Sequence, residues 1–120
     1  MGATSLLMPL DYVRLAVDVA VDKQGSDTVL LDIRGVSDFA DYFVVTTVES
    51  ARQMRALMND IEQAMEGSGA LLHHREGSGQ SGWVLLDFSD VVVHLFAPEE
   101  REYYSIEEVW SLGVETVRIQ

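Results

Sequence analysis

Apolar residues repeat at helical spacing near the start of the chain. From Tyr12 to Asp22 one side of the pattern is apolar, while Asp11, Arg14 and Asp18 fall on the other side. The apolar side consists of Val13, Ala16, Val17, Ala20 and Val21. This spacing predicts an amphipathic helix that packs one side on a core.

A second helix is predicted from Ser50 to about Met65. Ser50 and Gln53 form a capping-box pattern, in which the serine hydroxyl accepts from a first-turn amide and the glutamine returns to the Ser50 amide. Gly67 and Gly69 supply the positive φ angles that end such a helix. Its apolar stripe consists of Met54, Leu57, Met58, Ile61, Ala64 and Met65.

Longer apolar runs predict strands. Residues 28–33 form one run, and the nearly continuous run at 42–48 is typical of a mid-sheet strand that is covered on both faces. Residues 83–88 and 91–96 are separated only by Ser89-Asp90, so we expect them to pair as an antiparallel hairpin.

The remaining segments are shorter. Residues 70–75 predict an edge strand, and the glycine- and serine-rich residues 76–82 predict a flexible connection. Pro98 can open a short helix through Arg101. Residues 112–120 alternate weakly and fit either a strand or an ordered extension. The predicted fold class is therefore α/β, a mixed sheet of about five strands with helices packed on it.

Composition supports one domain over residues 1–120. The length and the 48% hydrophobic content suffice for a single core. Without cysteine the chain has no disulfide, thiolate zinc site or cysteine nucleophile, which suits a reducing cytoplasm. No apolar run approaches the length that spans a bilayer, and the first residues lack a secretory signal, so we expect no membrane contact.

The net charge of −12 changes the choice of partner. With one lysine and seven arginines, the chain has few basic residues to displace the counterions of a nucleic-acid backbone. Direct, sequence-specific nucleic-acid binding is therefore not expected, and a basic protein partner fits better. On charge alone, however, the simpler explanation is favoured, namely that the excess of acid only keeps a small domain soluble.

The segment from Trp83 to Trp110 carries a family signature. The pattern consists of Trp83, Asp87, Val93, His94, Arg101, Tyr104, Glu107 and Trp110. A second block, residues 51–57 (ARQMRAL), follows the strand that leads out of residues 37–47 (SDFADYFVVTT). With these two blocks the chain resembles the ribosome silencing factor family, also called Iojap-like. The resemblance covers about residues 10–112.

This resemblance implies a factor that is not an enzyme and that needs no cofactor. It would bind the large ribosomal subunit through the ribosomal protein numbered fourteen, at the face where the small subunit joins. Blocking that face would repress translation when nutrients are short, as in stationary phase. Whether the free protein forms a homodimer stays open.

The family's fold is related to nucleotidyltransferases, so a nucleotide-binding enzyme with degenerate motifs is the alternative. Such enzymes need a Gly-Ser at a helix start, an Asp-x-Asp pair and a further carboxylate to hold magnesium. Here Gly67-Ser68 lies at a predicted helix end and no Asp-x-Asp occurs. The loop at 76–82 also lacks the terminal Gly-Lys-Ser/Thr of a P-loop. The sequence thus favours a binding factor, with no catalytic residues and no metal site.

The candidate partner-binding residues are Trp83, Leu85, Asp87 and Tyr104. On the predicted strand, Trp83, Leu85 and Asp87 alternate onto one face and would supply an outward apolar anchor with a charge. Tyr104 adds an aromatic ring nearby, whereas Trp110 is expected in the core.

Histidines and the turn aspartates have ordinary explanations. His73 and His74 are adjacent and point apart, which disfavours a metal site and fits an exposed edge strand. His94 interrupts an apolar strand, so it either faces outward or is a hydrogen-bonded core histidine. Asp90 fits a turn residue that binds backbone amides, and Asp87 fits that role less well.

Overall fold

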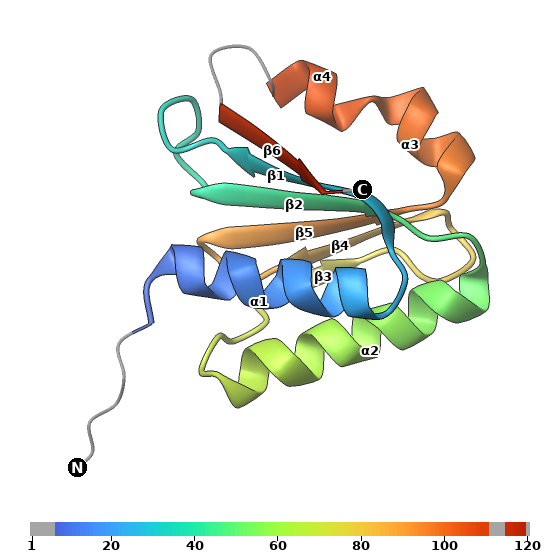
Figure 1. The fold of residues 1–120 in the computed structure, drawn as a ribbon, viewed down its shortest axis with the longest axis horizontal. Helices are drawn as coiled ribbons and strands as arrows, with labels where there is room; N and C mark the ends of the chain where they lie inside the picture. Colours follow the sequence, from blue (N-terminus) through green and yellow to red (C-terminus); the bar gives the residue numbers. More distant parts are fainter. Residues whose placement is uncertain (1–6, 111–114, 120) are drawn as a thin grey trace.

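A six-stranded mixed sheet runs through the middle of the protein, and two long helices lie together on one side of it (Figure 1). The computed structural model describes residues 7–110 and 115–119. In chain order the elements are α1 (Pro9–Asp22), β1 (Ser26–Asp32), β2 (Tyr42–Thr47), α2 (Ala51–Gly67), β3 (His74–Glu76), β4 (Trp83–Asp87), β5 (Val91–Phe96), α3 (Pro98–Tyr104), α4 (Ile106–Trp110) and β6 (Glu115–Ile119).

The strand order is β3-β4-β5-β2-β1-β6. At its centre β2 and β5 pair in parallel, from Tyr42 opposite Val91 to Thr47 opposite Phe96, and the other neighbouring strands pair antiparallel. Every residue of β2 and β5 is buried, which confirms the predicted mid-sheet strand. The α/β class is confirmed, but the sheet has six strands rather than about five. The additional strand is β6, in the segment where the sequence alternated only weakly.

Helix α1 packs on the sheet through Val13, Ala16, Val17 and Ala20, all of which are buried as predicted. Val21 was predicted on the same side, yet it is 45% exposed. At roughly 100° per residue, Val21 lies about 80° around the helix from Val13, at the margin of the stripe. The helix also begins at Pro9 rather than Tyr12, because proline suits the first helical position.

Helix α2 covers the rest of this face with Met54, Leu57, Met58, Ile61 and Met65, while Ala64 is only partly buried. Ser50 accepts from the Gln53 amide at 3.1 Å, as expected for its cap. The returning bond is different, because Gln53 Oε1 accepts from the Glu49 amide at 3.0 Å instead of the Ser50 amide. Of the two glycines predicted to end the helix, only Gly69 has a positive φ, of 102°.

The hairpin of β4 and β5 is confirmed, with Trp83 opposite Phe96 and Asp87 opposite Val92. The edge strand is also present, but β3 is limited to three residues, later than predicted. Pro98 occupies the first turn of α3, which Ser105 ends in a left-handed conformation with φ 44°. The core position expected for Trp110 lies outside the described side chains.

Two identical substitutions on α1 test this placement of the core. Val13→Ala should reduce the free energy of unfolding by about 2 kcal/mol, because it removes two methyl groups from a fully buried position. Val21→Ala should change it by no more than about 0.5 kcal/mol, because its side chain is exposed. Urea denaturation measures both, and equal losses would contradict the helix orientation.

Candidate partner-binding face

The sheet face opposite α1 and α2 carries the predicted partner-binding residues of β4. Trp83, Leu85 and Asp87 alternate onto this face, and each is partly buried. Cross-strand pairing places Phe96 beside Trp83 and His94 beside Leu85. With the apolar side chains of β1 and β2, these residues form a second, smaller core whose buried members are Val29, Leu31, Ile33, Ala40, Phe43, Val45, Val92 and Phe96.

The Trp83 ring is not an isolated, outward-pointing side chain, because three neighbouring side chains contact it. It stacks on Phe96 with ring centroids 5.0 Å apart and meets the Tyr104 ring at 4.6 Å. Its Nε1–H donates to Nδ1 of His94 over 3.2 Å. The structure therefore brings Trp83 and Tyr104 together although they are 21 positions apart, in a group that also includes His94 and Phe96.

His94 is a core histidine, the second of the two alternatives predicted for it. Its side chain is 2% exposed and meets the Phe43 ring edge to face at 4.6 Å. Because Nδ1 accepts from Trp83, the ring proton of the neutral imidazole is assigned to Nε2. Burial disfavours the charged form and lowers the pKa of His94 to about 4. This neutral imidazole fixes the orientation of the Trp83 indole.

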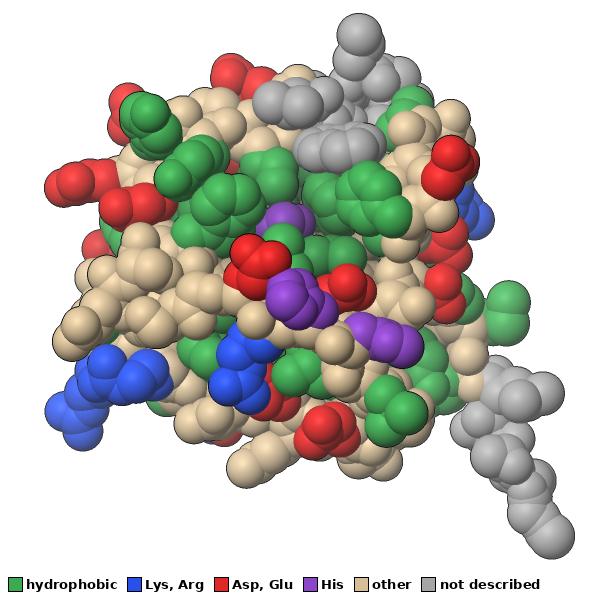
Figure 2. Space-filling view, turned by 180° about the vertical axis from the view of Figure 1, so that it is seen from behind, with side chains coloured by type: hydrophobic (Ala, Val, Ile, Leu, Met, Phe, Trp, Pro, Cys, Tyr) green, Lys and Arg blue, Asp and Glu red, His purple; other side chains and the backbone are tan. Residues whose placement is uncertain are grey.

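Exposed apolar side chains surround this group. Phe39, Tyr103 and Tyr104 are 61%, 81% and 46% exposed, and each has an aromatic neighbour in the group or next to it. Viewed from behind the molecule, hydrophobic side chains gather across the upper half, with acidic side chains beside them (Figure 2). We call the group of Phe39, Phe43, Trp83, His94, Phe96, Tyr103 and Tyr104 the aromatic face. Exposed aromatic area of this kind is typical of protein-interaction surfaces.

Asp87 has the structural role that the sequence analysis assigned to Asp90. Its Oδ1 accepts from the Ser89 amide at 2.7 Å, which caps the hairpin turn. The sequence favoured Asp90 for such a bond and considered Asp87 the weaker case, so the structure reverses this expectation. Asp87 still adds a negative charge beside the aromatic face.

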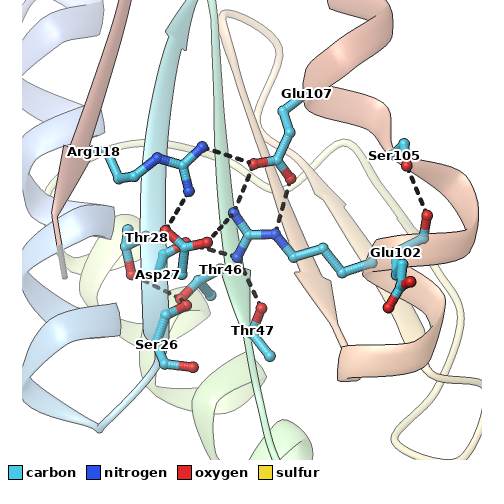
Figure 3. A network of polar contacts seen from close by, with 10 residues as sticks. Ser26, Asp27, Thr28, Thr46, Thr47, Glu102, Ser105, Glu107 and Arg118 are labelled. Atoms are coloured by element: carbon cyan, nitrogen blue, oxygen red, sulfur yellow. Dashed lines mark hydrogen bonds and ion pairs between the residues drawn. The ribbon is translucent and has the colours of Figure 1, made fainter.

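A buried arginine, Arg101, fixes the short helices at the rim of this face. Figure 3 shows the polar network in which Asp27, Thr47, Glu107 and Arg118 come together. Its Nε and Nη2 donate to the two carboxylate oxygens of Glu107, each over 2.9 Å. Its Nη1 donates to the Asp27 carbonyl at 2.6 Å and to the Thr47 hydroxyl at 2.8 Å. Arg118 of β6 bonds Asp27 and also reaches Glu107 at 3.3 Å. These bonds connect α3 and α4 to β1, β2 and β6.

Arg101 and Glu107 belong to the family pattern, but no role could be assigned to them from sequence. Arg101 contacts Asp27 and Thr47 from 74 and 54 positions away, and Glu107 lies six positions away in the next helix, so no regular helical spacing indicates these contacts. The hydrogen bonds from Arg101 are the main reason that the pKa of Glu107 lies below its ordinary value. Since Tyr104 is the last residue of α3, this ion pair also keeps Tyr104 against Trp83.

The histidine pair lies on and next to the edge strand. His74 Nε2 is 2.7 Å from Oε2 of Glu76, and both side chains are exposed. Within residues 7–110 and 115–119, no group of three or more histidine, aspartate or glutamate side chains is placed to hold a metal ion. None of the helices described is long and apolar enough to cross a bilayer.

Comparison with known proteins identifies similar sequences over most of the chain. A family model described as "Ribosomal silencing factor during starvation" matches residues 8–120. Ribosomal silencing factor RsfS of Halalkalibacterium halodurans is 35% identical over 83% of this chain and 86% of that protein. A mouse protein named for mitochondrial assembly of the ribosomal large subunit is 24% identical, and the match covers 87% of this chain and 50% of that protein.

A solved structure has the same fold. The crystal structure of a Chromobacterium violaceum protein superposes with a TM-score of 0.83 at 33% identity, covering 88% of each chain. The sheet and its helices are therefore arranged as in that protein.

The Glu107–Arg101 pair should stabilise the fold in a pH-dependent manner. Glu107→Gln should cost about 3 kcal/mol near neutral pH, because it removes the two short charged bonds of the buried Arg101 and leaves only the longer 3.5 Å contact with the Asp27 carboxylate. The pKa of Glu107 is lowered in the folded state, so its contribution is present above the ordinary value of 4.5 and is lost as the pH falls through the folded value.

Urea denaturation at a series of pH values should therefore show the wild type and Glu107→Gln converging only in acid. A difference that stays constant down to the acid limit of folding would contradict this assignment.

His94 should destabilise the fold in mild acid. Between its ordinary pKa of 6.5 and the folded value of about 4, the unfolded chain binds a proton that the folded chain does not. The free energy of unfolding should therefore fall by about 2 kcal/mol between pH 7 and 4.5, compared with His94→Asn. Asparagine can still accept from the Trp83 indole but does not titrate. Parallel pH profiles of the two proteins would show that His94 is not buried as described.

Proposed function

The chain belongs to the ribosomal silencing factor family, and on that premise we propose that it binds the large ribosomal subunit and blocks joining of the small subunit. The contact would be made to the large-subunit ribosomal protein numbered fourteen. Translation would then fall when nutrients are short, and the protein would act in the cytoplasm, where ribosomes work.

The observation that carries this proposal is the aromatic face, together with the carboxylates of Asp87 and Glu76 beside it. Tyr103 and Tyr104 are exposed there, and the half-buried Trp83 is oriented by the His94 bond. An aromatic ring whose orientation is already fixed loses little entropy on binding, and such rings commonly dominate interface energies. The name of the mouse relative also links one member of this group of proteins to the large subunit.

Charge directs the same face to a basic partner. Asp87 and Glu76 lie on it, and the two nearby arginines, Arg101 and Arg118, already contact Asp27 and Glu107. The net charge of −12 would repel ribosomal RNA and favour an exposed basic protein surface. Steric exclusion of the small subunit then requires no catalytic step.

Two further proposals concern the oligomeric state of the free protein and an alternative function. A homodimer that covers the aromatic face of both copies would compete with ribosome binding. A nucleotide-binding enzyme is the alternative from another class, and saturable binding of ATP or GTP with magnesium in calorimetry would support it.

Sedimentation with purified subunits tests the function. We expect the protein to pellet with large subunits, but not with small subunits or with assembled ribosomes. Tyr103→Ala should weaken this association, and Trp83→Ala should weaken it by about 2 kcal/mol, roughly thirtyfold. Leu71→Ala is the matched control, because Leu71 is 71% exposed but lies beyond α2, near Tyr12.

Thermal unfolding of each variant separates lost binding from lost structure. Tyr103 is 81% exposed, so Tyr103→Ala should fold normally even where Trp83→Ala loses some stability. Equal association of the wild type and Tyr103→Ala, with Trp83→Ala also unaffected, would exclude the aromatic face as the binding site.

A further inference from the structure

We propose that a cavity beside Trp83 binds one arginine side chain of the partner. This inference rests on the proposed function and specifies the chemistry that the aromatic face recognises. The cavity measures about 250 Å³ and is lined by Glu76, Gly77, Ser81, Trp83, Leu85 and Tyr104. It is smaller than the pockets of roughly 300–1,000 Å³ that hold small-molecule ligands, and it suits a single long side chain.

Two aromatic rings line the cavity. Trp83 and Tyr104 lie with ring centroids 4.6 Å apart and planes tilted by 46°. The Trp83 indole is held by its bond to His94, and Tyr104 is held because Arg101 fixes α3. Tryptophan attracts cations most strongly among the aromatic side chains, and a planar guanidinium can stack on such rings. The lining therefore favours a flat cation over a simple alkyl chain.

A carboxylate completes the site. Glu76 lies directly opposite Leu85 in the β3–β4 pair, so its side chain is on the same face as Trp83. It is 67% exposed, and the contact with His74 is made through Oε2. A guanidinium that stacks beside the rings can therefore donate to Oε1 of Glu76. None of the six lining residues is basic, so nothing within the cavity opposes a cation.

The backbone keeps Glu76 beside the tryptophan. Gly77 has a φ of 88°, and a Cβ added there would lie 2.0 Å from the Trp83 carbonyl oxygen. Only glycine fits this close approach between the chain leaving β3 and the start of β4. The distance between the carboxylate and the rings is thus set by main-chain packing.

A small arginine derivative provides a direct test with the whole protein. N-acetyl-arginine methylamide should shift the Trp83 indole N–H resonance in a saturable manner, whereas the neutral citrulline analogue should not. The chain has two tryptophans, so Trp110→Phe assigns the signal. Equal responses to the charged and the neutral compound would overturn the inference.

A charge-matched pair of variants tests the same site on the ribosome. Glu76→Gln should weaken binding to large subunits about fivefold, and Glu66→Gln, on the exposed side of α2, should leave it unchanged. Unchanged affinity of Glu76→Gln would overturn the arginine site while leaving ribosome binding intact. If the arginine derivative binds but the wild type does not associate with large subunits, the proposed function fails and the cavity's preference for arginine stands.

Discussion

One buried guanidinium organises the half of the molecule that faces away from the long helices. Removing Arg101 from water is costly, and the cost is offset because Glu107, Asp27 and Thr47 all accept its hydrogen bonds. These acceptors lie on different elements, so the same bonds fix α3 and α4 over the ends of β1 and β2. Without that attachment, the residues at the end of α3 would have no defined position against the sheet.

The position of α3 in turn determines the surface that we assign to binding. Tyr104 packs against Trp83. The Trp83 ring also stacks on Phe96 and donates a hydrogen bond to the neutral imidazole of His94. An ionised histidine in this place would lack the acceptor that the indole requires. The lowered pKa of His94, which burial causes, therefore keeps the aromatic face in one arrangement at physiological pH.

Much of this fold could be predicted from periodicity alone. The buried strands β2 and β5 and most of the stripes of α1 and α2 follow directly from apolar spacing, while Val21 is exposed and Ala64 is only partly buried. The sequence also placed Trp83, Leu85 and Asp87 on one face, because strand alternation is strict. It could not show that Trp83 contacts His94 or that Arg101 contacts Asp27, since those contacts depend on pairings between distant segments. The sequence left residues 112–120 open between a strand and an ordered extension for a similar reason: residues 117–119 are exposed and give a weak pattern, and the pairing of β6 with β1 supplies the order.

Hydroxyl-radical footprinting of side chains tests the central claim that the aromatic face is the ribosome-binding surface. Phe39, Tyr103 and Tyr104 are exposed in the free protein and should lose reactivity on adding large subunits. Leu71 and Met8 are also exposed but lie at the helix-covered side, and they should react equally in both states. Undiminished oxidation of Tyr103 and Tyr104, together with protection around α1 and α2, would contradict the account.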